Sequence, residues 1–196
     1  DLTAGMYTAI GILIALLQRE ETGKGQWVYT SLLEAQIAML DFQAARWLIG
    51  GEVPPQAGNN HPTSTPTGVF ATSDGFINIA SAGETMWKRL CGVLQADELF
   101  SNPDYATERS RHKHRDALNE DLSGYLQHRT SQQWIDALND AGVPSGPIYD
   151  IDEMFADPQV EHVGMAKSVQ HPKLGEVKVL KNAVNLSSTP DINYRP

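Results

Sequence analysis

A long apolar segment near the start of the chain leaves few possible folds. From Thr3 to Leu17 nearly every residue is apolar or small, no proline occurs, and polar residues and Gly23 follow. This pattern predicts one helix over 3–21 that ends at the glycine. Because apolar side chains lie on most of its sides, other protein must cover the helix. The uncharged part, 4–17, is shorter than the about 20 residues that cross a bilayer, so we interpret it as a buried helix and expect no membrane partner.

Charge and cysteine content exclude several classes of protein. The formal net charge is −9 at pH 7, which argues against the positive surface that nucleic acid or an anionic membrane requires. Cys91 is the single cysteine, so an intramolecular disulfide and a zinc site with several thiolates are both impossible. His112 and His114 are two residues apart and face different sides of a helix. We therefore expect a cytoplasmic protein without a metal.

The rest of the chain alternates between helical and extended patterns. Residues 26–30 predict a short strand and 32–49 a second helix. The segment 50–68 is rich in Pro, Gly and Asn, which predicts a linker or functional loop and a domain boundary. The later elements are expected as a β-hairpin over 69–80, helices at 85–94, 111–126 and 131–139, and extended segments at 147–150, 165–169 and 176–180.

Several segments, taken in order, resemble one enzyme family. The most specific is Asp1–Met6, followed by the apolar helix and the turn at 22–26. Others follow in the same order: 58–62, 66, 68–70, 74–75, 87, 90–91, 130–134, 142–147, 157–159, 171–172, 175 and 186–190. Together they resemble the family III CoA transferases, or CaiB/BaiF family. That group contains formyl-CoA transferase and carnitine CoA-transferase and is related to the α-methylacyl-CoA racemases.

The resemblance implies an α/β fold, present here as a mixed α+β fragment. We expect 1–50 to be helices and a short strand of a large domain, 51–67 a linker and active-site loop, 68–170 a small α+β domain, and 171–196 a return linker. The chain opens inside a helix without a methionine, so we expect the natural protein to continue in both directions. The N-terminal CoA-binding half and the C-terminal end would then lie outside it. The resemblance also implies an interlocked homodimer.

By the same resemblance, Asp1 is the catalytic residue. A transferase that moves CoA between carboxylic acids needs a carboxylate that attacks a thioester. Asp1 would attack the donor acyl-CoA to give a mixed anhydride, and the CoA thiolate would return to give an aspartyl-CoA thioester. The N-terminus of the following helix would stabilise the oxyanions. The structural alternative is that Asp1 only caps this helix, a position where aspartate is favoured.

The resemblance also implies that a loop closes over the active site. The segment 50–68 is the candidate, with Gly58, Asn60 and His61 as substrate-binding residues; the alternative is that they only form a turn. The basic run 109–115 would either contact a CoA phosphate or form the solvated start of a helix, and we prefer the second interpretation. No residue is assigned to CoA binding. We expect acyl-CoA and an acceptor acid as substrates and no tightly bound cofactor.

Two other functions remain open. A racemase would use the same aspartate with a histidine from an earlier part of the chain. The glutamate that follows the hairpin in racemases would align with Gly83, one residue before Glu84, which favours the transferase. The third possibility is a non-catalytic packing and dimerisation domain. We expect this chain alone to be inactive as an enzyme and, because of its apolar helix, to self-associate.

Overall fold

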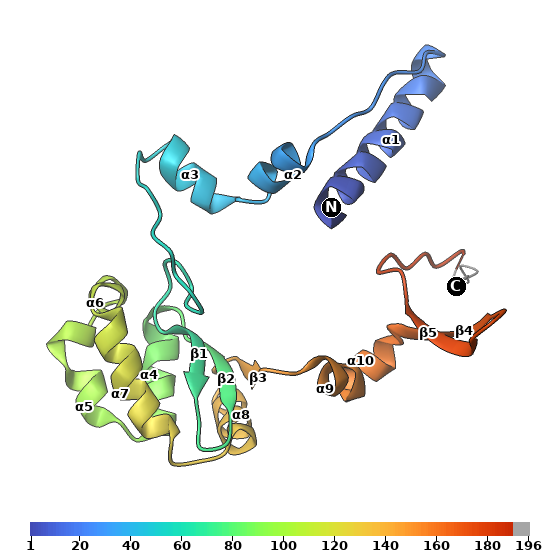
Figure 1. The fold of residues 1–196 in the computed structure, drawn as a ribbon. Helices are drawn as coiled ribbons and strands as arrows, with labels where there is room; N and C mark the ends of the chain where they lie inside the picture. The colour runs from blue at the N-terminus through green and yellow to red at the C-terminus, as the bar shows by residue number, and fades with distance from the viewer. Residues whose placement is uncertain (190–196) are drawn as a thin grey trace. The chain divides into compact units, whose positions relative to one another are not determined.

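The structure, a computed structural model, describes residues 1–189 and contains both helices and strands, as the sequence predicts (Figure 1). It divides into two compact units, Asp1–Gly58 and Asn59–Pro196. The finer division into four parts stays a prediction. The first unit contains α1 (Leu2–Thr22), α2 (Leu32–Ala38) and α3 (Phe42–Leu48).

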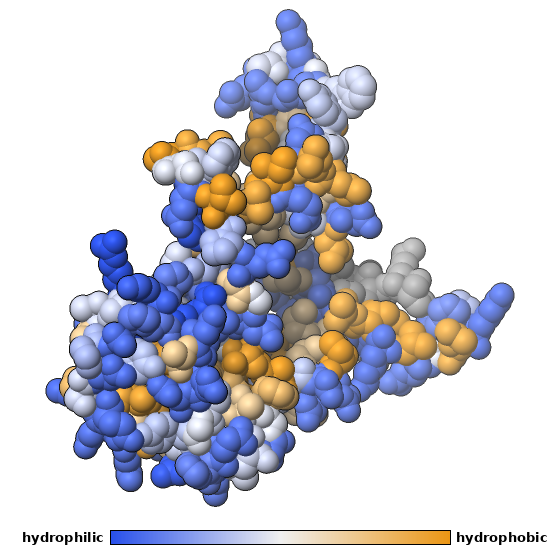
Figure 2. Space-filling view, turned by 60° about the vertical axis from the view of Figure 1, so that its left-hand side comes forward, coloured by the Kyte–Doolittle hydropathy of each residue, from blue (hydrophilic) through white to orange (hydrophobic). Residues whose placement is uncertain are grey.

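Helix α1 begins and ends as predicted. Gly23 follows it with a φ of 68°, in the left-handed region that glycine adopts easily, and its N–H donates to the Arg19 carbonyl at 2.8 Å. None of the residues of α1 is buried, although the sequence predicts a buried helix, and apolar side chains lie at the surface (Figure 2). With 21 residues and a mean hydropathy of 1.4 over its best window, α1 is long and apolar enough to cross a membrane by these two measures alone.

Two predictions for the first unit are wrong. Residues 26–30 form no strand: Trp27 and Tyr29 are exposed, and in the described part of the chain no strand pairs with this segment. High β-propensity forms a strand only where a second strand supplies hydrogen bonds. The predicted helix 32–49 is interrupted between α2 and α3, where Asp41 has φ 48° and ψ −126°. A residue with this backbone conformation cannot continue a helix.

A three-stranded antiparallel sheet organises the second unit. It contains β1 (Thr67–Ala71), β2 (Phe76–Ala80) and β3 (Ser145–Pro147), in the order β1-β2-β3. The first two strands are the predicted hairpin, with Phe70 opposite Ile77. Ile77 and Ile79 are fully buried while Phe76 and Asn78 are exposed, as expected for alternating side chains with one covered face.

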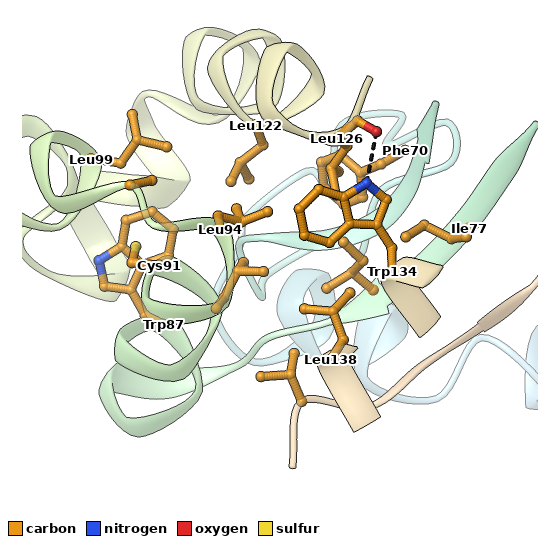
Figure 3. Close-up of a cluster of buried hydrophobic side chains, with 14 of the residues drawn as sticks. Phe70, Ile77, Trp87, Cys91, Leu94, Leu99, Leu122, Leu126, Trp134 and Leu138 are labelled. Carbon is orange, nitrogen blue, oxygen red and sulfur yellow. Dashed lines mark hydrogen bonds between the residues drawn. The ribbon is translucent and has the colours of Figure 1, made fainter. Parts of the chain in front are cut away.

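Helices pack on this sheet and on one another. They are α4 (Gly83–Leu94), α5 (Asp97–Ser101), the short 3₁₀ helix η1 (Pro103–Tyr105), α6 (Glu108–Lys113), α7 (Arg115–Leu126) and α8 (Ser131–Asp140). Leu122, Leu126, Trp134 and Leu138 meet there in one apolar cluster, shown in Figure 3. Cys91 also belongs to this core, where its thiol is free and buried.

The observed ends of these helices agree in part with those predicted from the sequence. Thr130 and Gln133 form a capping box at the start of α8, and Gly142 follows its end with a φ of 71°. The single helix predicted over 111–126 is instead two, α6 and α7, separated at His114. His114 has φ −106° and ψ 28°, outside the helical region, so the chain changes direction there.

The last part of the second unit contains two helices that the sequence analysis missed, α9 (Ile151–Ala156) and α10 (Pro158–Val163). A hairpin follows, β4 (Ala166–His171) and β5 (Gly175–Leu180), close to the predicted extended segments. An open cavity of about 630 Å³ is lined by Ile151, Met154, Phe155, Ala166, Lys178, Val179 and Leu180. The end of the return linker predicted over 171–196, residues 190–196, lies outside the described residues.

Candidate functional site

Asp1 stands at the N-cap position of α1, where the peptide dipoles give the helix end a partial positive charge. Its backbone carbonyl accepts the first helical hydrogen bond from the Gly5 N–H at 2.9 Å. Its exposed side chain makes no capping hydrogen bond. The structural alternative of a capping carboxylate therefore finds no support in the geometry, while the catalytic assignment stays a prediction.

The structure divides the predicted substrate-binding residues between the two units. Gly58 ends the first unit with a φ of 57°, a conformation in which glycine is favoured. Asn60 and His61 begin the second unit, and both belong to a loop that folds back on β1. In this loop the His61 N–H donates to the Thr67 carbonyl at 2.8 Å. The loop is therefore anchored to the edge of the sheet.

Asn60 is held from two sides. It forms an isolated antiparallel bridge with Gly68, and its Oδ1 accepts a hydrogen bond of 2.8 Å from the Asn119 side chain on α7. A Cβ atom on Gly68 would lie 2.8 Å from the Asn59 carbonyl oxygen and 2.9 Å from Asn60 Oδ1. Such contacts are too short for a side chain, so glycine at 68 allows the loop to pass close to the strand.

The ring nitrogen Nδ1 of His61 is a hydrogen-bond acceptor. It lies 3.0 Å from the Ser64 amide nitrogen and 3.3 Å from the Thr63 amide nitrogen, and both of these groups can only donate. Nδ1 must therefore accept, so a neutral ring carries its proton on Nε2. In this state Nε2 carries the ring N–H, and the lone pair of Nδ1 is engaged by the two backbone amides.

Sequence reasoning missed the buried arginine beside this loop. Arg111 is fully buried, so the prediction of a solvated helix start over 109–115 is wrong at this position. Its guanidinium donates to the carbonyls of Thr65, at 3.2 Å, and Tyr105, at 2.9 Å, and lies 5.2 Å from the ring centre of Trp87. These acceptors and the Glu84 carboxylate compensate the cation, which makes its burial possible.

Glu84 pairs with this arginine through both carboxylate oxygens. Oε1 accepts from Arg111 Nη2 at 3.1 Å and from the Glu108 N–H at 3.0 Å, and Oε2 accepts from Arg111 Nη1 at 3.2 Å. Hydrogen bonds from the guanidinium hold the pKa of the Glu84 carboxyl below its ordinary value. The Thr65 carbonyl is 46 residues from Arg111 in the sequence, so no local pattern could reveal this cluster.

The two histidines of the basic run make separate contacts. His112 Nδ1 lies 3.2 Å from the Thr65 hydroxyl, whereas His114 Nδ1 lies 3.2 Å from the Asp104 carbonyl oxygen. Within residues 1–189, no three His, Cys, Asp or Glu side chains are grouped so that they could hold a metal ion.

The comparisons with known proteins agree with the resemblance noted in the sequence. The sequence profile of CoA-transferase family III matches residues 1–196. Human succinyl-CoA:glutarate CoA-transferase is 33% identical over 196 residues, which are 100% of this chain and 45% of that protein. Acetyl-CoA:oxalate CoA-transferase of Acetobacter aceti is 33% identical over 196 residues, which are 100% of this chain and 49% of that protein.

The fold is also that of a solved relative. The crystal structure of a CaiB/BaiF family protein from Brucella suis matches with a TM-score of 0.79 and 31% sequence identity, over 95% of this chain and 48% of that one. The chain thus spans about half the length of the relatives it matches. Because the family profile covers every residue, the chain belongs to CoA-transferase family III.

Proposed function

We propose that the complete protein transfers CoA between carboxylic acids, with Asp1 as the nucleophile. The observation that carries the proposal is the position of Asp1, in a chain of this family, at the N-terminus of a 21-residue helix with a side chain free of any capping hydrogen bond. A carboxylate there can attack a carbonyl carbon. The positive end of the helix dipole favours the oxyanion that forms.

The proposed reaction uses only carboxylate and thiolate chemistry. The Asp1 carboxylate attacks the acyl-CoA carbonyl carbon, the C–S bond breaks, and a mixed anhydride and CoA thiolate result. The thiolate attacks the aspartyl carbonyl carbon and releases the donor acid, which leaves an aspartyl-CoA thioester. The acceptor carboxylate attacks this thioester to form a second anhydride and thiolate. Attack of that thiolate on the acceptor's carbonyl carbon gives the new acyl-CoA and restores Asp1.

The substrates and assembly belong to the same proposal. The names of the two relatives contain glutarate and oxalate, so we propose a dicarboxylic acid as acceptor, with no tightly bound cofactor. We propose a cytoplasmic homodimer in which the half of the polypeptide outside this chain covers the exposed α1. The chain by itself would then be inactive and would associate through that helix.

The contacts of Glu84 argue against the racemase alternative. This glutamate lies next to the position that aligns with the racemase glutamate, yet both of its oxygens are occupied by Arg111 and one also by the Glu108 N–H. A carboxylate held in this way stabilises the fold and is not available to move an α-proton.

The experiment uses the gene extended in both directions. The complete protein is incubated with a panel of acyl-CoAs and acceptor acids in heavy water, and protein and thioesters are analysed by mass spectrometry. We expect an adduct on the peptide that contains Asp1 and CoA on the second acid, both lost on Asp1→Asn. Asp140→Asn, at an exposed position of α8, is the matched control and should keep both. Deuterium at the α-carbon without an adduct would identify a racemase instead, and neither signal would leave a packing role.

A further inference from the structure

Residues 25–30 of the first unit have an unpaired backbone. They run between α1 and α2 outside any helix or turn (Figure 1). Within residues 1–189, none of their backbone N–H or C=O groups makes a hydrogen bond. The side chain of Gln26 holds the segment to α1 through a hydrogen bond of 2.6 Å from its Nε2 to Gln18 Oε1. Such backbone groups can be covered by other protein only if that protein supplies hydrogen bonds to them.

The side chains of this segment alternate as those of a strand do. Trp27 and Tyr29 are 87% and 77% exposed. Val28 and Thr30, the residues that follow each of them, are partly covered. Val28 packs so closely on α1 that a Cβ atom added to Gly11 would lie 2.8 Å from Val28 Cγ1. Helix α1 therefore covers one face of the segment, and the two aromatic rings lie on the other face.

We propose that residues 25–30 form a β-strand in the complete protein, paired with a strand of the polypeptide that lies outside this chain. The chain spans about half the length of its relatives, so a complete protein of that length has ample further polypeptide. The segment 25–30 carries no charged residue, whereas exposed edge strands are commonly protected by charges. The proposal rests on the proposed covering of α1 by that polypeptide, and not on the transfer reaction.

The unpaired backbone favours a strand over other kinds of partner. A helix that lay on Trp27 and Tyr29 would cover their rings, but its own N–H and C=O groups are bonded within the helix. It would leave the backbone of 25–30 unpaired. A strand presents its N–H and C=O groups at the spacing that the segment needs. A strand of the same polypeptide also has a higher effective concentration than a second copy of the segment.

Hydrogen exchange tests this pairing without any substrate. The complete protein, from the gene extended in both directions, and the 196-residue chain are placed in heavy water, and the amides of 26–30 are followed residue by residue by mass spectrometry. We expect exchange on the order of 100-fold slower in the complete protein, because strand hydrogen bonds protect amides that are open in the chain alone. Fast exchange in both proteins would overturn the proposal. Slow exchange in both would also overturn it, because the segment would then pair with a second copy of itself.

Two glycine variants of the complete protein test whether α1 supports the strand. Gly11→Ala and Gly5→Ala add the same methyl group to the same helix, but only the first meets Val28; within residues 1–189 nothing lies within 4 Å of a Cβ on Gly5. Gly11→Ala should speed the exchange of 26–30 at least about tenfold, and Gly5→Ala should change it less than about threefold. Equal effects would refute the placement of the strand on α1. Slow exchange in a wild-type protein that transfers no CoA would refute the proposed reaction and leave the strand pairing intact.

Discussion

Replacement of Trp134 by phenylalanine tests how the core of the second unit is held together. The indole Nε1 of this buried residue donates to the Leu126 carbonyl at 2.8 Å, as Figure 3 shows. Leu126 is the last residue of α7, so its carbonyl has no partner within the helix. Trp134→Phe leaves this buried oxygen without a donor, which costs about 1–3 kcal/mol in addition to the loss of ring area.

Trp87 provides a matched control. It is equally buried in the same core and also lies under an arginine, but among residues 1–189 its Nε1 has no hydrogen-bond partner. Trp87→Phe loses similar ring area and removes a buried N–H that was never satisfied, so no partner is left unpaired. The free energy of unfolding of Trp134→Phe should therefore be about 1–3 kcal/mol lower than that of Trp87→Phe.

Urea denaturation followed by far-UV circular dichroism measures this difference. With a slope of about 1–3 kcal/mol per molar urea, the midpoints should differ by about 1 M. Equal midpoints, or a lower midpoint for Trp87→Phe, would refute the argument that loss of the hydrogen bond to the Leu126 carbonyl adds to the cost of the lost ring area.

Three further changes test other parts of the second unit. Gly68→Ala places a Cβ against the loop and should lower turnover of the complete protein at least tenfold. A tenfold lower rate corresponds to an activation free energy that is higher by about 1.4 kcal/mol. Gly146→Ala is the control: its new Cβ meets nothing within 4 Å, so turnover should stay unchanged. Because the pKa of Glu84 is lower in the folded chain than in the unfolded chain, its stabilisation is present above pH 4.5 and is lost as the pH falls through the lower folded value. Glu84→Gln should therefore flatten the dependence of the urea midpoint on pH below about 4.5, and an unchanged dependence would contradict this reasoning. Thr130→Ala removes the hydroxyl that caps α8 and should lower the free energy of unfolding by about 1 kcal/mol, measured by the same urea titration; a neutral result would show that the capping bond contributes nothing.

Local signals account for the elements that could be predicted from the sequence. The end of α1 was predictable because Gly23 supplies the left-handed residue of a helix end, and the β1-β2 hairpin because a turn sequence separates two β-rich segments. The break at Asp41 was not, because the apolar periodicity continues on both sides of it. The break at His114 was not, because it lies in a polar segment that no proline or glycine interrupts. The two short helices α9 and α10 were missed although Asp150 and Asp157 cap their starts.

The candidate site was less accessible to sequence reasoning than the fold. Resemblance to the family pointed to Asp1 and to the loop with Asn60 and His61, but the contacts that shape this loop join residues far apart in the chain. Asn119 is 59 residues from Asn60, and Arg111 is 46 residues from Thr65. In the sequence Arg111 is one of several neighbouring cations, and only tertiary packing distinguishes the buried one from the solvated ones.

The single cysteine, Cys91, can report local opening of the core in which it is buried. Burial raises the pKa of the Cys91 thiol to about 12, so at neutral pH the native protein holds almost no thiolate for an alkylating reagent. Alkylation must then wait until the α4 side of the core opens, and its rate follows the population of that open form. The rate at which one alkyl group is added per chain, followed by mass spectrometry, would therefore report how often this core opens in any of the variants above. The measurement needs no label, and no second cysteine interferes.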